Sequence, residues 1–149
     1  MLSDHAEGSH GGTTADGLCG AIIAGVIHVQ RNLDADLSLD ALAARAAFSP
    51  YRFHRVFAAA MGETLGAHIR RLRLERAAIA PRDSATNVTE TAFEAGYESV
   101  EAFSRAYRAA FGAAPSDHRQ NGAWSPLLTA PSGVHFGRDG VVNRLQLDQ

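Results

Sequence analysis

One segment of the chain recurs fifty places further along, and this internal repeat constrains the fold more than any other feature. The matched positions of the first copy are Ser49, Phe53, Arg55, Phe57, Ala59, Ala60 and Gly62, and those of the second are Ser99, Phe103, Arg105, Tyr107, Ala109, Ala110 and Gly112. Each copy follows a shorter apolar stretch and a tight turn, which is the pattern of a helix-turn-helix unit. Two unrelated amphipathic helices share apolar spacing by chance, but they rarely keep an arginine at the same place beside the buried stripe. The repeat therefore predicts a duplicated helix-turn-helix unit.

Apolar spacing and helix-boundary residues predict an all-α fold with about seven helices. The expected helices run from about residue 21 to 34, 38 to 46, 49 to 61, 64 to 80, 87 to 95, 99 to 111 and 115 to 119. The predicted N-caps are Ser38, Ser49, Thr64 and Ser99, and Asn87 with Glu90 resembles a capping box. Gly62 and Gly112 are expected to end their helices, because glycine adopts the left-handed conformation at little cost. Pro81 is expected to stop or kink the fourth helix.

The two ends of the chain differ in composition from the middle. Residues 1–20 are rich in Gly, Ser, Thr and Asp, and we expect a disordered arm there. Residues 121–149 are punctuated by proline and glycine, which indicates an irregular tail, either a remnant of a further domain or an extension without function. The folded domain is thus expected at 21–120. The lone cysteine, Cys19, and the lack of a signal peptide or membrane-length apolar run favour a cytoplasmic protein.

Charge is unevenly distributed along a chain whose net charge is only -2. Seven arginines stand between Arg45 and Arg76, against Glu63 and Glu75, whereas 83–101 holds five acids and no base. The chain has no lysine, so every fixed cation is a guanidinium, whose forked donors suit phosphate and guanine. The first helix-turn-helix unit is therefore the more suitable of the two for a nucleic acid.

The segment 37–119 resembles the DNA-binding domain of AraC/XylS-type transcription regulators. Three motifs carry the resemblance: LSLDALAARAAFSPYRFHRVF, GETLGAHIRRLRLERA and GYESVEAFSRAYRAAFGAAPSDHR. The resemblance implies two helix-turn-helix subdomains joined by a linker helix, here the fourth. It also implies a regulator rather than an enzyme, without cofactor or metal, whose partners are double-stranded DNA and RNA polymerase. Ala80 and Pro81 differ from the aliphatic residues that the family usually has near the end of the linker.

By the same resemblance, the third and sixth helices enter successive segments of the major groove. The residues that match groove-facing positions are Tyr51, His54 and Arg55 in the third helix, and Val100, Glu101, Ala102, Ser104 and Arg105 in the sixth. Arg55 is expected to bond the two acceptor atoms of a guanine. Because both reading helices belong to one chain, we expect a monomer on an asymmetric site.

The linker helix carries Arg70, Arg71, Arg73 and Arg76, which cannot all face one way. We expect some of them to contact phosphate, or to pair with Glu75 or with acids of the fifth helix, and His68 to be a partly buried, satisfied histidine. Two functions of other classes stay open on the residues alone. One is the DNA-targeting module of a DNA-repair enzyme, which would need an activated cysteine. The other is a helical adaptor that binds protein, whose binding would ignore salt.

Overall fold

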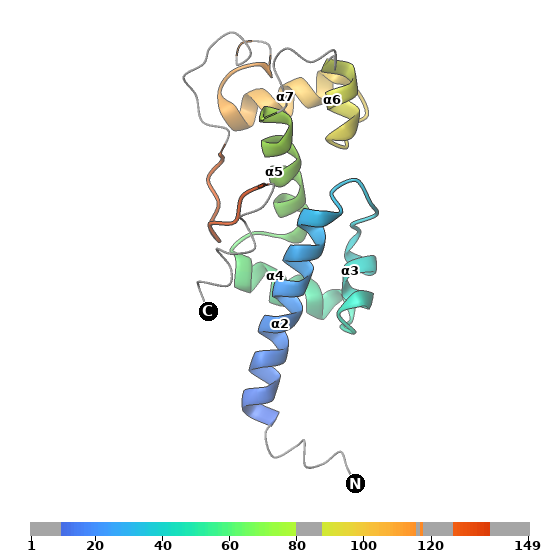
Figure 1. The fold of residues 1–149 in the computed structure, drawn as a ribbon, viewed down its shortest axis with the longest axis vertical. Helices are drawn as coiled ribbons and strands as arrows, with labels where there is room; N and C mark the ends of the chain where they lie inside the picture. Colours follow the sequence, from blue (N-terminus) through green and yellow to red (C-terminus); the bar gives the residue numbers. More distant parts are fainter. Residues whose placement is uncertain (1–9, 80–87, 116, 118–126, 138–149) are drawn as a thin grey trace.

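The protein is an elongated, all-helical molecule with a central helix that joins two groups of helices (Figure 1). This computed structural model describes residues 10–79, 88–115, 117 and 127–137. The helices in these ranges are α2 (His10–Arg31), α3 (Leu39–Arg45), α4 (Pro50–Met61), α5 (Leu65–Ala78), α6 (Val88–Glu94) and α7 (Val100–Phe111). The prediction of two helical subdomains on a linker helix is confirmed, with α5 as the linker. No helix in the described ranges has the length and apolar character needed to cross a membrane.

Each group of helices has its own apolar core, and α5 contributes to both. The first core takes buried side chains from α2, α3 and α4 and from Leu65, Ile69 and Leu72 of α5. The second core is smaller and combines Leu74 of α5 with buried residues of α6 and α7. The linker helix is therefore part of both units, and neither unit has a complete core without it.

The repeat seen in the sequence is also a repeat in the structure. The hydroxyl of Ser49 accepts the Arg52 N–H at 3.1 Å, and the hydroxyl of Ser99 accepts the Ala102 N–H at the same distance. Both helices end on a left-handed glycine, which takes φ values of 75° at Gly62 and 83° at Gly112. The predicted caps at Ser38 and Thr64 are likewise present. A serine side chain therefore fixes where each of α4 and α7 begins, and the left-handed backbone of a glycine fixes where each one ends.

The turns that precede α4 and α7 differ in length by one residue. The left-handed residue of the first turn is Ala47, with φ 61°, two places before the cap Ser49. In the second turn it is Gly96, with φ 91°, three places before the cap Ser99. Matched positions are therefore fifty residues apart in α4 and α7, but the left-handed residues of the two turns are forty-nine apart. The second turn is longer by one residue.

Ala47→Gly is expected to raise the free energy of unfolding by about 0.5–1 kcal/mol, because a Cβ in the left-handed region is strained and glycine removes that strain. Urea unfolding of the full chain measures the change. Ala44→Gly, at an exposed position inside α3, is the matched control and should lower stability by about 1 kcal/mol. A loss of stability in both variants would show that Ala47 is not strained.

The N-terminal helix is longer than the sequence suggested. It begins at His10 rather than near residue 21, so residues 10–20, predicted to be a disordered arm, are helical. Adding residues to an existing helix needs no new nucleus, and the second half of α2 is already held by apolar residues that pack in the first core. The expected N-cap Asn87 and the helix breaker Pro81 lie outside the described residues. Of the expected seventh helix, Pro115 and Asp117 are described, and both are helical.

Residues 127–137, which we call the strap, lie beside α5 and contain neither helix nor strand (Figure 1). The backbone of this segment is irregular, with one turn at residues 131–132. Its packing was not foreseen: Val134 is fully buried in the first core, and Phe136 packs against it. Gln30 of α2 donates from Nε2 to the backbone carbonyl of His135 at 3.0 Å. The strap is therefore an integral part of the fold and not a loose extension.

Candidate nucleic-acid interface

The outer face of α4 exposes the three residues that the sequence predicted for it. Tyr51 is 70% exposed, and His54 and Arg55 are exposed as well. Arg55 donates from Nη1 to the Tyr51 hydroxyl at 3.3 Å, and its guanidinium carbon lies 5.5 Å from the centroid of the Tyr51 ring. These contacts span one helical turn and restrict the arginine, which reduces the entropy it would lose on binding. The first turn of α4 contains no acid to compete for the guanidinium.

The corresponding face of α7 is less open and less basic. Of the five predicted residues, Glu101 and Arg105 are exposed, whereas Val100, Ala102 and Ser104 are half-buried. A shallow open hollow on this helix is lined by Glu101, Ser104, Arg105, Arg108 and Ala109. A carboxylate in the first turn of α7 would meet the phosphate-lined groove unfavourably unless it accepts from a cytosine amino group. The two faces therefore share a shape but differ in charge.

Two exposed arginines on these faces were missed by the sequence analysis. The guanidinium of Arg52 lies 5.3 Å from the centroid of the Phe48 ring, at the start of α4. Arg108 lines the hollow on α7. Each stands three places from an arginine that was predicted, Arg55 or Arg105, and residues three apart share a helix face. That spacing was the signal that would have found them.

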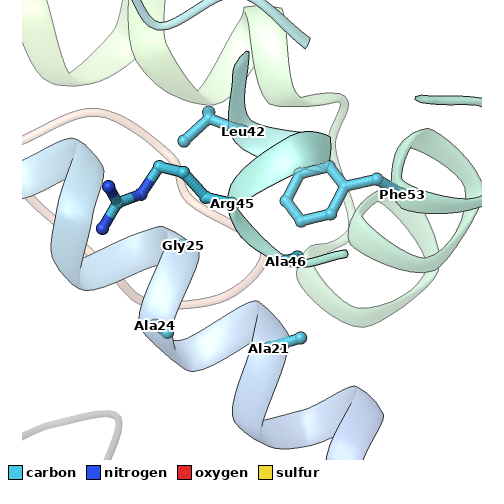
Figure 2. A pocket seen from close by; sticks show the side chains of 7 residues that line it. All are labelled: Ala21, Ala24, Gly25, Leu42, Arg45, Ala46 and Phe53. Atoms are coloured by element: carbon cyan, nitrogen blue, oxygen red, sulfur yellow. The ribbon is translucent and has the colours of Figure 1, made fainter. Parts of the chain in front are cut away.

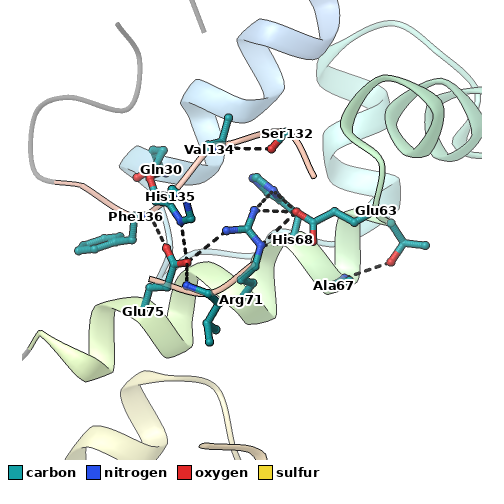
Figure 3. Close-up of polar contacts among 12 residues, drawn as sticks. Gln30, Glu63, Ala67, His68, Arg71, Glu75, Ser132, Val134, His135 and Phe136 are labelled. Atoms are coloured by element: carbon teal, nitrogen blue, oxygen red, sulfur yellow. Dashed lines mark hydrogen bonds and ion pairs between the residues drawn. The ribbon is translucent and has the colours of Figure 1, made fainter. Parts of the chain in front are cut away.

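Arg71 of the linker helix is buried between two carboxylates (Figure 3). Its Nη2 lies 2.6 Å from Glu63 Oε2, and its Nη1 lies 3.3 Å from Glu75 Oε2. Burial alone would raise the pKa of Glu63, but hydrogen bonds from His68 and Arg71 and the charge of Arg71 lower that pKa to about 2. Arg71 therefore forms ion pairs inside the protein. The predicted pairing of a linker arginine with Glu75 is confirmed.

His68 is more deeply buried than predicted and is only half satisfied. The side chain is fully buried, with its ring against Phe57, and its Nδ1 lies 3.1 Å from Glu63 Oε2. Its Nε2 has no hydrogen-bond partner among the described residues. The apolar environment of the first core explains why that nitrogen meets neither a donor nor an acceptor among the described residues.

Two further linker arginines bridge the helical groups. Arg73 donates from Nη2 to the backbone carbonyl of Leu33 at 2.7 Å, and burial and the nearby Arg76 lower its pKa. Arg76 donates from Nη2 to Asp34 Oδ1 at 2.9 Å and to the backbone carbonyl of Glu94 at 2.7 Å. The carbonyl of Glu94, not its acidic side chain, is thus the partner in α6. Arg70 is the linker arginine of this set that is exposed to solvent.

A small pocket lies between α2, α3 and α4, on the side of α4 that faces the core (Figure 2). Its volume is about 260 Å³, and it is lined by Ala21, Ala24, Gly25, Leu42, Arg45, Ala46 and Phe53. Binding sites for small molecules usually measure roughly 300–1,000 Å³. The described residues also contain no group of three side chains that could hold a metal ion. The exposed faces of α4 and α7, which carry the predicted residues, are the candidate functional surface.

Comparisons with known proteins identify the family of the chain. A family model described as a helix-turn-helix domain matches residues 42–121. The right origin-binding protein of Escherichia coli K12 is 34% identical over 106 residues, which cover 71% of this chain and 37% of that protein. The regulatory protein SoxS of the same organism is 33% identical over 91 residues, which cover 61% of this chain and 85% of SoxS. The chain thus matches little more than a third of the length of the first of these relatives.

Solved structures show the same fold. A transcriptional regulator with an AraC-type DNA-binding domain from Chromobacterium violaceum superposes with a TM-score of 0.64 at 24% identity, over 70% of this chain and 93% of that chain. The DNA-binding domain of AdpA, solved in complex with a target DNA, gives a TM-score of 0.60 at 25% identity, over 66% of this chain and 89% of that chain. With the match to the family model and to SoxS, these findings show that the chain belongs to the AraC-type family of helix-turn-helix DNA-binding domains.

Proposed function

We propose that this chain is a sequence-specific DNA-binding transcription regulator that inserts α4 and α7 into successive major-groove segments. The observation that carries the proposal is the structural repeat: two helices with the same caps expose one face each at opposite ends of α5 (Figure 1). α5 has 14 residues and is therefore about 20 Å long. The separation of two helices packed across its ends is therefore on the scale of one turn of DNA, roughly 34 Å.

Side chains on these two faces contact the DNA bases directly. Arg55 bonds the O6 and N7 atoms of a guanine, His54 bonds a base or phosphate, and Tyr51 packs on a sugar or a thymine methyl. In α7, Arg105 reads a base, and the other residues of its predicted set approach the groove: Val100, Glu101, Ala102 and Ser104. The exposed arginines outside the predicted set supply phosphate contacts: Arg52, Arg70 and Arg108.

The DNA-binding domain in this proposal spans residues 21–120, and it acts in the cytoplasm as a monomer on an asymmetric site. Two different reading surfaces in one chain remove the need for a two-fold partner. RNA polymerase is the protein partner that such a regulator contacts at a promoter. Sedimentation of the complex with its site tests the monomer, and a stable dimer on a palindromic site would contradict it.

Arg55→Ala is expected to weaken binding to the preferred site by about 1–3 kcal/mol and to relax the preference at one or two base pairs. Arg105→Ala is expected to weaken binding less, because Glu101 makes the α7 face less favourable for a groove. A selection from random double-stranded DNA identifies the site, and titration at one fixed salt concentration measures each variant.

Arg31→Ala is the matched control, since it removes an exposed guanidinium at the end of α2, outside both reading helices. Equal weakening by Arg55→Ala on every sequence would make Arg55 a phosphate contact. If selection enriches no sequence and binding does not change with salt, the proposal is wrong and a protein partner is indicated.

A further inference from the structure

The carboxylate of Glu75 is fully buried, and the strap is bound to it (Figure 3). Glu75 Oε1 accepts the backbone N–H of Phe136 at 2.8 Å, and Oε2 accepts the backbone N–H of Leu128 at 3.0 Å. His135 Nδ1 lies 2.9 Å from the same Oε2. One side chain of the linker helix thus holds the strap at both of its ends. Bonds to a charged acceptor are stronger than bonds between neutral groups, so this is a firm attachment.

The strap in turn contacts both helix-turn-helix units. Val134 is buried in the first core, and Leu128 packs against the second core. Between them, Pro131 lies against the end of α4, where a Cβ built on Gly62 would come within 2.6 Å of the Pro131 Cβ. The segment therefore passes from one unit to the other along α5 and touches each of them with apolar side chains.

A second connection between the units lies on another side of α5. Arg76 joins Asp34, which follows α2, to the Glu94 carbonyl of α6. Arg73, two residues before Glu75, bonds the Leu33 carbonyl, and residues two apart project to nearly opposite sides of a helix. The units are thus tied on one side by arginines and on the other by Glu75 and the strap.

We propose that Glu75 is a positioning residue, which fixes the direction of α7 relative to α4 through the strap and so sets the half-site spacing that the protein accepts. This inference rests on the proposed function. When two linked reading elements bind one DNA, the second binds at an effective concentration that is highest where their geometry matches the spacing. Loosening the strap lowers affinity at the best spacing and makes other spacings relatively better.

Glu75→Gln tests this role with little change in shape. Four donors, the Leu128 N–H, the Phe136 N–H, Arg71 Nη1 and His135 Nδ1, point at the two carboxylate oxygens of Glu75. An amide has one oxygen, so in either orientation its NH₂ group faces a donor. Glu63→Gln is the matched control, because it also alters an ion pair of Arg71, and its bonds in the described residues go to Arg71 and His68 rather than to the strap.

The first measurement is affinity for DNAs that carry both half-sites at the selected spacing, at spacings one or two base pairs shorter or longer, and for the first half-site alone. We expect Glu75→Gln to lose at least about tenfold at the best spacing, to flatten the spacing profile, and to stay within about twofold on the half-site. Glu63→Gln should keep the wild-type profile. A wild-type profile in Glu75→Gln would overturn the inference, whereas a wild-type protein with no preferred sequence would overturn the proposed function instead.

The second measurement needs no DNA. Spin labels on Ala59→Cys and Ala109→Cys, in the full chain with Cys19→Ser, occupy matched exposed positions on α4 and α7. The distribution of label–label distances should be narrow with Glu75 or with Glu63→Gln, and broad with Glu75→Gln. Because circular dichroism reports whether the helices persist, general unfolding is recognised separately. Distributions of equal width in folded Glu75→Gln and in the protein with Glu75 would show that the strap does not fix α7.

Discussion

Arg71→Met is expected to lower the free energy of unfolding by about 3–5 kcal/mol. Methionine fills most of the space of the arginine stem but removes the guanidinium that lies between Glu63 and Glu75. Two carboxylates then remain close together with little water, since Glu75 is fully buried and the Glu63 side chain is only 12% exposed. Removing one member of a buried ion pair leaves uncompensated charge, which costs more than the pair itself contributes. Urea unfolding of the variant and the parent measures the loss.

The pH dependence of that loss identifies its cause. In the parent protein the pKa of Glu63 is lowered to about 2, so its contribution to stability is present above its ordinary value of 4.5 and is lost as the pH falls toward 2. In Arg71→Met the remaining carboxylates repel each other, which raises the folded-state pKa of at least one of them. The deficit of the variant should therefore shrink between about pH 7.5 and about pH 4.5.

Arg70→Met provides the control for charge and helix propensity, because Arg70 is the neighbouring residue on α5 and is exposed. Its effect on the free energy of unfolding should stay within about 0.5 kcal/mol. A deficit in Arg71→Met that is the same at both pH values, or no larger than that of Arg70→Met, would show that the buried carboxylates are not the reason.

Gly62→Ala and Gly112→Ala form a matched pair with different expected costs. Gly62 ends α4 and Gly112 ends α7 in the left-handed conformation, so a Cβ costs about 1–2 kcal/mol at either place. At Gly112 no non-neighbouring heavy atom of the described residues lies within 4 Å of that Cβ, whereas at Gly62 the Pro131 Cβ lies 2.6 Å away. Displacing Pro131 adds about 1–3 kcal/mol, typical of overpacking. Gly62→Ala should therefore be the more destabilising of the two by that amount in urea unfolding.

A second substitution tests whether the extra cost of Gly62→Ala comes from the contact with Pro131. The double variant Gly62→Ala, Pro131→Gly lacks the Pro131 Cβ that the new methyl group would meet. We expect it to recover the difference in free energy of unfolding between Gly62→Ala and Gly112→Ala, while the backbone strain at position 62 remains. Equal costs for Gly62→Ala and Gly112→Ala would mean that the strap moves aside freely at Pro131.

Local signals predicted most of the helices and the whole repeat. A capping serine or threonine forms its bond to an N–H three residues later, so Ser38, Ser49, Thr64 and Ser99 could be recognised without knowledge of the fold. The exposed face of α4 was also predictable from the sequence. Phe53 and Phe57 lie four residues apart on one side of the helix, so the residues on the opposite side face solvent. Comparable spacing did not reveal that part of the α7 face is half-buried, since that depends on neighbouring elements.

The interior of the linker helix was harder to predict. His68, Arg71 and Glu75 stand at three- and four-residue spacing on the same stripe as the apolar residues of α5, and all three are buried. An analysis that counts only apolar residues along a stripe misses such a polar network. The strap left no local signal, because its key bonds run from the backbone N–H groups of Leu128 and Phe136 to a distant side chain. Any residue other than proline at those places could make the same bond.

The burial of Val134 has a consequence for how the molecule forms. Val134 shares the first core with Ile22, more than a hundred positions earlier in the chain. On the ribosome, the first unit emerges early but cannot complete its core until the strap has been synthesised. Contacts of such long sequence separation raise the contact order above that of an ordinary helical bundle and slow folding accordingly. They also make the two units cooperative, because a chain that releases the strap exposes apolar surface in both cores at once.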